Sequence, residues 1–183
     1  MPWYRKQGRG KILEAMTDKD FQKGMTDGHF CSKKHRGFSV LVYYSGVRRL
    51  EALRPVKEQF QITETAVFFD VLKRLKHGIE TPPLKIPRDA AFVEELVQAI
   101  QETKLGKRVF PYSKRTAYNI IDRVFNRYPH FFRLSRITNF FAEGWTIAQV
   151  KSWTGLTLQA LNYYVGLVDI AKMGESLGKV KRE

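Results

Sequence analysis

The 183-residue sequence has a single cysteine, Cys31, which excludes an internal disulfide bond and cannot form a zinc site alone. No apolar run approaches the roughly 18 residues that a membrane-spanning helix needs. The first eleven residues, MPWYRKQGRGK, lack the apolar core of a signal peptide. The chain also has no internal repeat and no low-complexity segment. These absences predict a cytoplasmic protein.

Acidic residues are scarce relative to basic ones, with 18 Asp and Glu against 32 Lys and Arg, and the net charge is +14. An apolar content of 43% argues against disorder, and the length suits one domain with a hydrophobic core. The charge excess is typical of a protein with a polyanionic partner, most often nucleic acid; a solvated basic surface is the alternative. Residues 1–15 are interpreted as a basic arm along a phosphate backbone, or as an unstructured tail.

The residue pattern predicts a mainly helical α+β fold with one small antiparallel sheet. The β-branched and aromatic segments FQI, AVFFDVL and PLKIP, within residues 60–88, are the expected strands. The expected helices are one from Asp18, capped by Thr17 and Asp20 and ended by Gly24 and Gly28; a buried helix over 38–44 that breaks near Gly46; a helix ended by Pro55; 90–104, capped by Asp89; 114–128, capped by Ser113 and closed by Pro129; 133–142, ended by Gly144; a helix from the Thr146 and Gln149 capping box to Trp153, ended by Gly155; and 158–173, capped by Thr157.

Phosphoryl transfer on a nucleic acid sets requirements that the sequence can be searched for. The phosphate gains negative charge on its non-bridging oxygens, which guanidinium groups match in a bidentate way. A hydroxyl nucleophile must lose a proton, and the leaving sugar oxygen must gain one. Two arginines, a base, an acid and a nucleophile suffice without a metal ion. The sequence has no Asp, Glu and His cluster at metal-ligand spacing, so we expect no cofactor and no metal.

Two stretches hold candidate side chains for the charge clamp. In SGVRRLE, Arg48 stands at a helix start, and Glu51 can pair with an arginine on the same helical face. In PHFFR, His130 and Arg133 are three residues apart, so both project from one face of a helix. Taken singly, a surface arginine and an isolated His-x-x-Arg are ordinary features.

The candidate nucleophile is one of two neighbouring tyrosines. Tyr163 and Tyr164 are adjacent on an expected helix, so their side chains diverge by about 100°. Only one of them can face a given cleft, and an aromatic pair on an amphipathic helix is usually part of a core.

These stretches together resemble the tyrosine recombinase (phage integrase) family. SGVRRLEALR is similar to its first-arginine motif, PHFFRLSRITNFFAEG to its H-x-x-R box, the hairpin to its lysine-bearing turn, and WTGLTLQALNYYVGL to the segment before the nucleophile. The similarity runs from about Met16 to Lys172, and YVGLVDIAK resembles archaeal-type integrases. It implies a catalytic domain over 16–175 between a basic arm (1–15) and a basic tail (176–183), without the family's N-terminal core DNA-binding domain.

The resemblance implies a role for each candidate residue. Arg48 and Arg133 clamp the scissile phosphate, Tyr164 attacks it to form a 3′-phosphotyrosyl bond, and His130 assists proton transfer. A hairpin lysine protonates the leaving 5′ oxygen; Lys73 is preferred, ahead of Lys76 and then Lys85. Tyr163 remains the alternative nucleophile.

The sequence departs from the family pattern after Gly155. Leu156 stands where the family has His or Trp, and Trp153 either replaces that group as an N–H donor to the phosphate or belongs to the core. The spacing to the tyrosine is one residue short. The implied function is site-specific recombination (integrase, excisionase or resolvase) on double-stranded DNA, by a tetramer on DNA whose isolated domain can be monomeric. The alternatives are a type IB topoisomerase and a non-catalytic DNA-binding relic of the fold.

Overall fold

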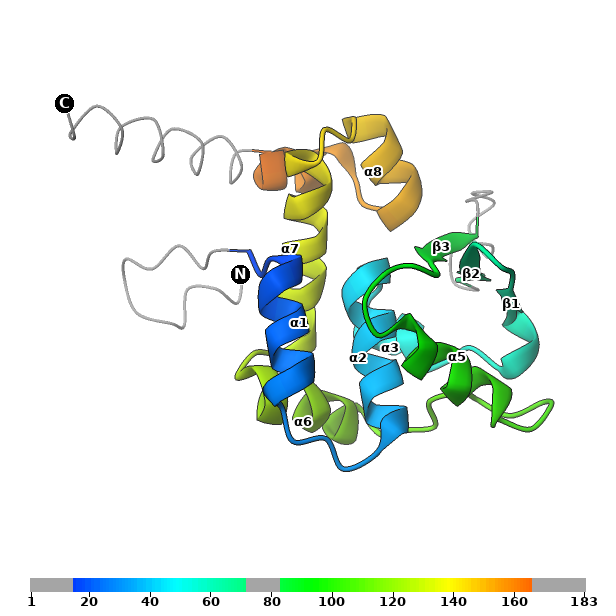
Figure 1. Ribbon diagram of the computed structural model, residues 1–183. Helices are drawn as coiled ribbons and strands as arrows, with labels where there is room; N and C mark the ends of the chain where they lie inside the picture. The colour runs from blue at the N-terminus through cyan, green and yellow to red at the C-terminus, as the bar shows by residue number, and fades with distance from the viewer. Residues whose placement is uncertain (1–14, 72–82, 166–183) are drawn as a thin grey trace.

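The computed structural model describes residues 15–71 and 83–165. Within these ranges no helix is long and apolar enough to cross a membrane. The expected mainly helical α+β architecture is confirmed (Figure 1). The elements, in chain order, are α1 (Asp18–Asp27), α2 (Lys33–Ser45), α3 (Arg49–Ala52), the 3-10 turn η2 (Lys57–Gln59), β1 (Phe60–Ile62), β2 (Ala66–Phe69), β3 (Leu84–Pro87), α5 (Val93–Gln101), α6 (Lys114–Phe125), α7 (Pro129–Ala142) and α8 (Ile147–Thr154). Residues 158–165 are also helical.

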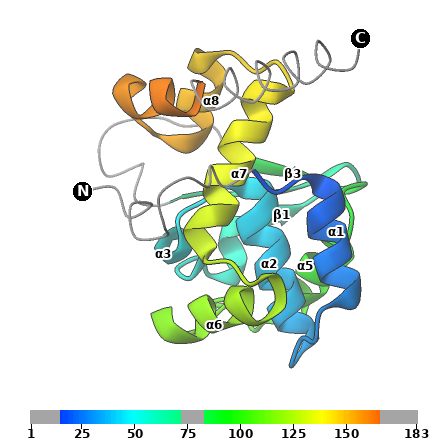
Figure 2. The same cartoon turned by 90° about the vertical axis from the view of Figure 1, so that its left-hand side faces the viewer.

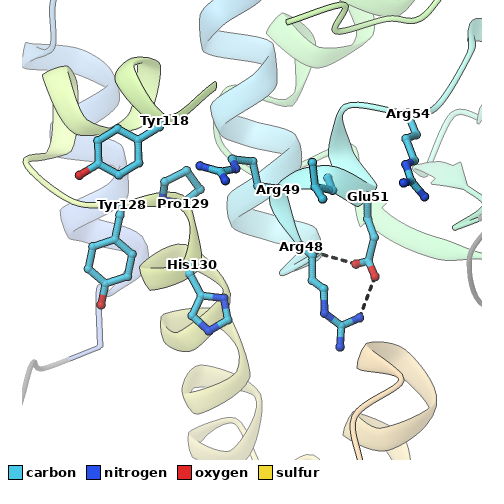
Figure 3. A pocket seen from close by; sticks show the side chains of 9 residues that line it. Arg48, Arg49, Glu51, Arg54, Tyr118, Tyr128, Pro129 and His130 are labelled. Carbon is cyan, nitrogen blue, oxygen red and sulfur yellow. Dashed lines mark hydrogen bonds and ion pairs between the residues drawn. The ribbon is translucent and has the colours of Figure 1, made fainter. Parts of the chain in front are cut away.

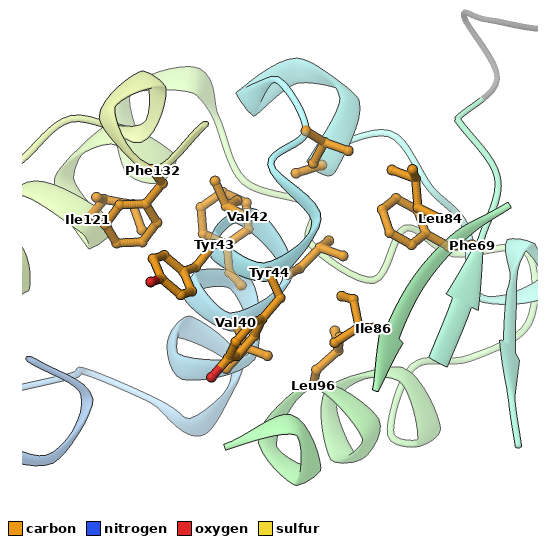
Figure 4. Packing of buried hydrophobic residues seen from close by; sticks show 14 of the residues in the cluster. Val40, Val42, Tyr43, Tyr44, Phe69, Leu84, Ile86, Leu96, Ile121 and Phe132 are labelled. Carbon is orange, nitrogen blue, oxygen red and sulfur yellow. The ribbon is translucent and has the colours of Figure 1, made fainter. Parts of the chain in front are cut away.

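Helix α2 lies at the centre of the molecule and is buried continuously from Gly37 to Ser45. A helix that is apolar all round has to be covered on every side. Helices α6 and α7 cover one side, and α5 and the sheet cover the other (Figure 1). Figure 4 shows the result, with Tyr43 facing Phe132 on one side of α2 and Leu96 packing on the opposite side.

The small sheet is antiparallel in the order β1-β2-β3. Phe69 is paired with Phe60 on β1 and with Leu84 on β3, and this face packs into the core. The three strands were predicted from their β-branched and aromatic residues, although β2 ends at Phe69 rather than continuing to residue 72.

Several helix ends follow the predicted capping residues. Thr17 and Asp20 form a capping box at α1, which runs through Gly24 and ends at Gly28. Gly46 adopts the left-handed conformation (φ 62°) that ends α2, a conformation that costs glycine little. Ser113 caps α6, and Thr146 with Gln149 caps α8.

Three predicted helix starts were wrong. Helix α2 begins at Lys33, capped by Ser32, rather than at residue 38. Asp89 does not cap α5, because residues 88–92 form turns and Phe92, in the left-handed region (φ 64°), precedes the first helical residue. The guanidinium of Arg36 lies 5.2 Å from the centre of the Phe92 ring, so tertiary packing outweighs the local capping signal. Helix α7 begins at Pro129 rather than at Arg133, since proline suits a first helical position.

The end of α6 also differs from the prediction. The helix stops at Phe125 because Asn126 adopts the left-handed conformation (φ 49°), which asparagine tolerates well. The early end of α6 and the early start of α7 together place His130 in the first turn of α7.

Candidate active site

Arg48 is fixed where the chain leaves α2 and enters α3. Its backbone N–H donates to one carboxylate oxygen of Glu51 (2.8 Å), and its Nη1 donates to the other (2.8 Å). Burial favours the neutral form of Glu51, but the Arg48 amide, its guanidinium and the Arg133 charge outweigh burial and hold the pKa of Glu51 below its usual value. Glu51 is thus a buried carboxylate, whereas the Arg48 side chain is 47% exposed. The predicted arginine–glutamate pair is present, and it orients a guanidinium that solvent can reach.

Arg133 projects from α7 and is almost completely buried, with 1% of its surface exposed. Its Nη1 donates to the backbone carbonyl of Gly46 (2.6 Å) and its Nη2 to that of Thr154 (3.1 Å). These two carbonyls lie at the ends of α2 and α8, where the helices leave acceptors without an intrahelical partner. Arg133 therefore connects three helices while carrying a charge that burial does not remove.

His130 lies one helical turn before Arg133, with an exposed side chain. Desolvation by the surrounding protein, followed by the positive charges of Arg133 and Arg48, lowers the pKa of His130. His130 and Arg48 project toward the same side of the molecule from different elements (Figure 3). The imidazole therefore favours its neutral form, which can accept a proton.

The two tyrosines occupy different environments on the helical segment 158–165. The Thr157 hydroxyl accepts from the backbone N–H of Ala160 (3.3 Å), as predicted for the cap. Tyr164 is 8% exposed and Tyr163 is 46% exposed. Burial raises the pKa of Tyr164, whereas the charges of Arg133 and Arg48 pull that pKa down. Both arginines therefore act on Tyr164 as well as on His130.

Tyr163 faces a different neighbour. The pKa of Tyr128 is raised to about 12, mainly by burial, and the charge of Tyr163 raises it further. The side chains of Tyr163 and Tyr164 diverge as the helical spacing predicted, with their rings in an edge contact at 5.7 Å. Of the two, Tyr164 is the buried one, and the charges of both arginines act on it.

The preferred lysines, Lys73 and Lys76, lie outside the described residues. Lys85 is in β3, exposed and paired with Phe68 in the sheet. The basic arm, the basic tail and the chain after residue 165 also lie outside the described residues.

Trp153 belongs to the core in this structure. Its indole N–H donates to the backbone carbonyl of Ser45 (2.9 Å), and its ring meets Phe140 and Trp145 edge-on, each at 5.6 Å. In the protein alone this donor is used at the end of α2, and its contact with a phosphate stays a prediction. Leu156 packs against the core, and its backbone N–H donates to the Thr154 hydroxyl (3.3 Å).

A pocket of about 480 Å³ is lined by Arg48 and His130 together with residues that the sequence did not single out. They come from α3 and the segment after it, from α6, and from the residue before α7 (Figure 3): Arg49, Arg54, Tyr118 and Tyr128. The available signal was the second arginine of SGVRRLEALR and the arginine five residues after it. Across residues 15–71 and 83–165, no group of three His, Cys, Asp or Glu side chains could hold a metal ion.

Comparison with known proteins shows the fold. No protein-family model matches the sequence, and no curated protein matches it. The structure is similar to the XerH site-specific recombinase bound to difH substrate, in a pre-cleavage complex (TM-score 0.66, 16% identity, 84% of this chain and 49% of that one). It is also similar to a post-cleavage XerH complex with palindromic difH (0.69, 15%, 86% and 50%) and to the XerA recombinase (0.63, 11%, 86% and 60%).

These similarities confirm the expected fold, that of a tyrosine-recombinase catalytic domain with one small antiparallel sheet. The chain spans about half of the length of the XerH chains that it matches.

Proposed function

We propose that this chain is the catalytic part of a site-specific DNA recombinase that breaks and rejoins strands through a phosphotyrosine at Tyr164. One arrangement carries the proposal: Arg133 of α7 bonds to the Gly46 carbonyl beside the segment of Arg48, while Arg48 and His130 line one pocket. The charges of both arginines act on His130 and on Tyr164. A base, a hydroxyl and two guanidinium groups are the set that metal-free phosphoryl transfer requires. The fold shared with recombinases solved on DNA supports the proposal.

In the proposed reaction, the Tyr164 oxygen attacks a backbone phosphorus and the bond from phosphorus to the 5′ oxygen breaks. The phenol proton passes toward His130, and the leaving 5′ oxygen takes a proton from a lysine between β2 and β3, with Lys73 preferred and Lys76 as the alternative. Arg48, held by Glu51, and Arg133 stabilise the charge on the non-bridging oxygens. Attack by a 5′-hydroxyl on the phosphotyrosine reverses the steps, so rejoining needs no nucleotide cofactor.

The partner in this proposal is double-stranded DNA, which the net charge of +14 favours. Exchange between two sites calls for two pairs of subunits, so we expect a tetramer on DNA and a protein located with the DNA. Within the chain, residues 16–175 form the catalytic unit, flanked by the basic arm and the basic tail. Whether the reaction integrates, excises or resolves depends on the paired sites.

Covalent trapping tests the proposed nucleophile. Wild-type protein is incubated with a pool of nicked suicide duplexes of random sequence, and a denaturing gel detects protein–DNA adducts. We expect an adduct with wild type and with Tyr163→Phe, and none with Tyr164→Phe, because Tyr164 is the buried tyrosine of the pair and the charges of both arginines act on it. Loss in Tyr163→Phe alone would assign the nucleophile to Tyr163.

A non-catalytic DNA-binding relic is the alternative that one observation favours, since Leu156 offers no side-chain donor and Trp153 uses its N–H within the core. DNA binding without an adduct from any variant would support that alternative. If adducts form, relaxation of a supercoiled plasmid without exchange between two sites would instead indicate topoisomerase activity.

A further inference from the structure

The pocket beside the candidate active site continues from it onto a surface with no role in the proposed chemistry. It shares Arg48 and His130 with the candidate site, but neither Arg133 nor Tyr164 lines it. Its volume of about 480 Å³ lies within the range of sites that hold small molecules or ligand fragments. A feature that begins at the reacting phosphate and extends away from the nucleophile can hold more of the same strand.

The charge lining this pocket is not balanced. Glu51 is the one carboxylate in the lining, and both of its oxygens bond to Arg48. Within the described residues, 15–71 and 83–165, the ion pairs involve neither Arg49 nor Arg54. Two guanidinium groups thus face the pocket without a carboxylate from the described part of the chain, which favours an anionic occupant.

The arginines lie at different places around α3. Figure 3 shows Arg49 reaching toward Tyr118 and Pro129, while Arg54 lies on the other side of Glu51, with Arg48 between them. A single phosphate does not account for this spread, but a chain of phosphates does. The remaining lining combines Leu50 and Pro129 with two phenols, and deoxyribose offers apolar carbons and oxygens to such a surface.

We propose that this pocket is a track for one sugar–phosphate backbone, in which Arg49 and Arg54 bind the phosphates that flank the one at Arg48. The inference rests on the proposed function, because it takes the group at Arg48 to be a DNA phosphate. Tyr118 and Tyr128 border the sugar on the Arg49 side, and the Tyr118 hydroxyl can donate a hydrogen bond to it. The contacts are to the backbone, so they position the strand without reading its sequence.

The salt dependence of DNA binding tests this track. The probe is a fluorescent 30-base-pair duplex of random sequence, and anisotropy gives the dissociation constant over a series of salt concentrations. Each phosphate contact contributes about 0.9 to the slope of log K against log salt. We expect Arg49→Ala and Arg54→Ala each to reduce the magnitude of that slope by about 1, and the double variant to reduce it by about 2.

Two controls separate track contacts from general charge and from damage to the fold. Lys23→Ala removes one positive charge from the exposed surface of α1, which Figure 2 shows apart from α3, and should leave the slope unchanged. Arg49→Lys with Arg54→Lys keeps both charges and should retain the wild-type slope, whereas a structural role would be lost with lysine as with alanine.

The outcomes distinguish this inference from the proposed function. A double alanine variant with the wild-type slope would overturn the track even if adducts form at Tyr164. A reduced slope without adducts from wild type would support the track and count against the recombinase. A wild-type protein that binds no duplex would contradict both.

Discussion

Arg133 is a buried charge whose hydrogen bonds organise the candidate active site. The carbonyls of Gly46 and Thr154 belong to helix ends that need donors, and the guanidinium supplies them. A guanidinium has five N–H donors, and the two bonds to carbonyls fix its orientation at the end of α2. The same residue therefore holds the site together and contributes the charge that the proposed reaction needs.

The protonation of His130 should be linked to DNA binding. In the free protein the pKa of His130 is lowered from its ordinary value near 6.5, by desolvation and by the charges of Arg133 and Arg48. A phosphate between these arginines adds negative charge and raises that pKa. Binding then takes up protons, so affinity strengthens as the pH falls through the raised pKa of the bound state toward the lowered pKa of the free state. Calorimetry in buffers of different ionisation enthalpy measures the proton uptake.

Two histidine variants make this test specific. His130→Gln should lose the proton uptake, and His29→Gln, on the exposed segment after α1, should keep it. Equal uptake in wild type and His130→Gln would mean that the phosphate does not bind beside His130.

At the scale of the elements, α8 is attached to the end of α2 by Trp153. Its indole N–H bonds to the Ser45 carbonyl, and the neighbouring Thr154 carbonyl accepts from Arg133. Trp153→Phe keeps an aromatic ring but removes that donor, which should lower the free energy of unfolding by about 1 kcal/mol. Adduct formation should slow as well, since α8 precedes the helical segment that carries Tyr164. Urea denaturation and the trapping gel give the two measurements.

Trp145→Phe is the matched control. Trp145 packs in the same aromatic cluster, but the hydrogen bond to the Ser45 carbonyl comes from Trp153, so this variant leaves that bond in place. Slower adduct formation in Trp153→Phe with unchanged stability would contradict the attachment and favour direct contact between the indole and the phosphate. That contact is the alternative that the sequence left open.

Local sequence signals predicted the elements well where capping residues act alone, and poorly where tertiary contacts compete. Ser113 and the Thr146–Gln149 box begin helices as expected, since their side chains satisfy nearby backbone donors. Asp89 failed because Phe92 is held under Arg36, which is distant in the sequence. The sequence also could not show the pocket at Arg49 and Arg54, because it forms only when α3 and α6 are brought together around α7.

For the whole molecule, the position of α2 explains why distant segments meet at one site. Gly46 ends α2 and turns the chain toward Arg48, while α7 and α8 approach the same end of the helix (Figure 2). Near the other end of α2, Arg36 bonds to Glu95 of α5 and Gly37 lies against the α5 backbone. The site therefore depends on a core that is continuous from α7 through α2 to α5 and the sheet.

Gly37, at the contact between α2 and α5, tests that dependence. A β-carbon at this position would lie 2.6 Å from the Glu95 carbonyl oxygen, which belongs to the backbone of α5 and cannot move aside alone. Gly37→Ala gains about 1 kcal/mol of helix propensity, but overpacking costs about 1–3 kcal/mol. We expect net destabilisation in urea denaturation, and Ser152→Ala on the exposed face of α8 should show the propensity gain without the clash. An equal rise in the free energy of unfolding for Gly37→Ala and Ser152→Ala would contradict this expectation. It would mean that α5 can move away from α2, so that the two sides of the core do not form one cooperative unit.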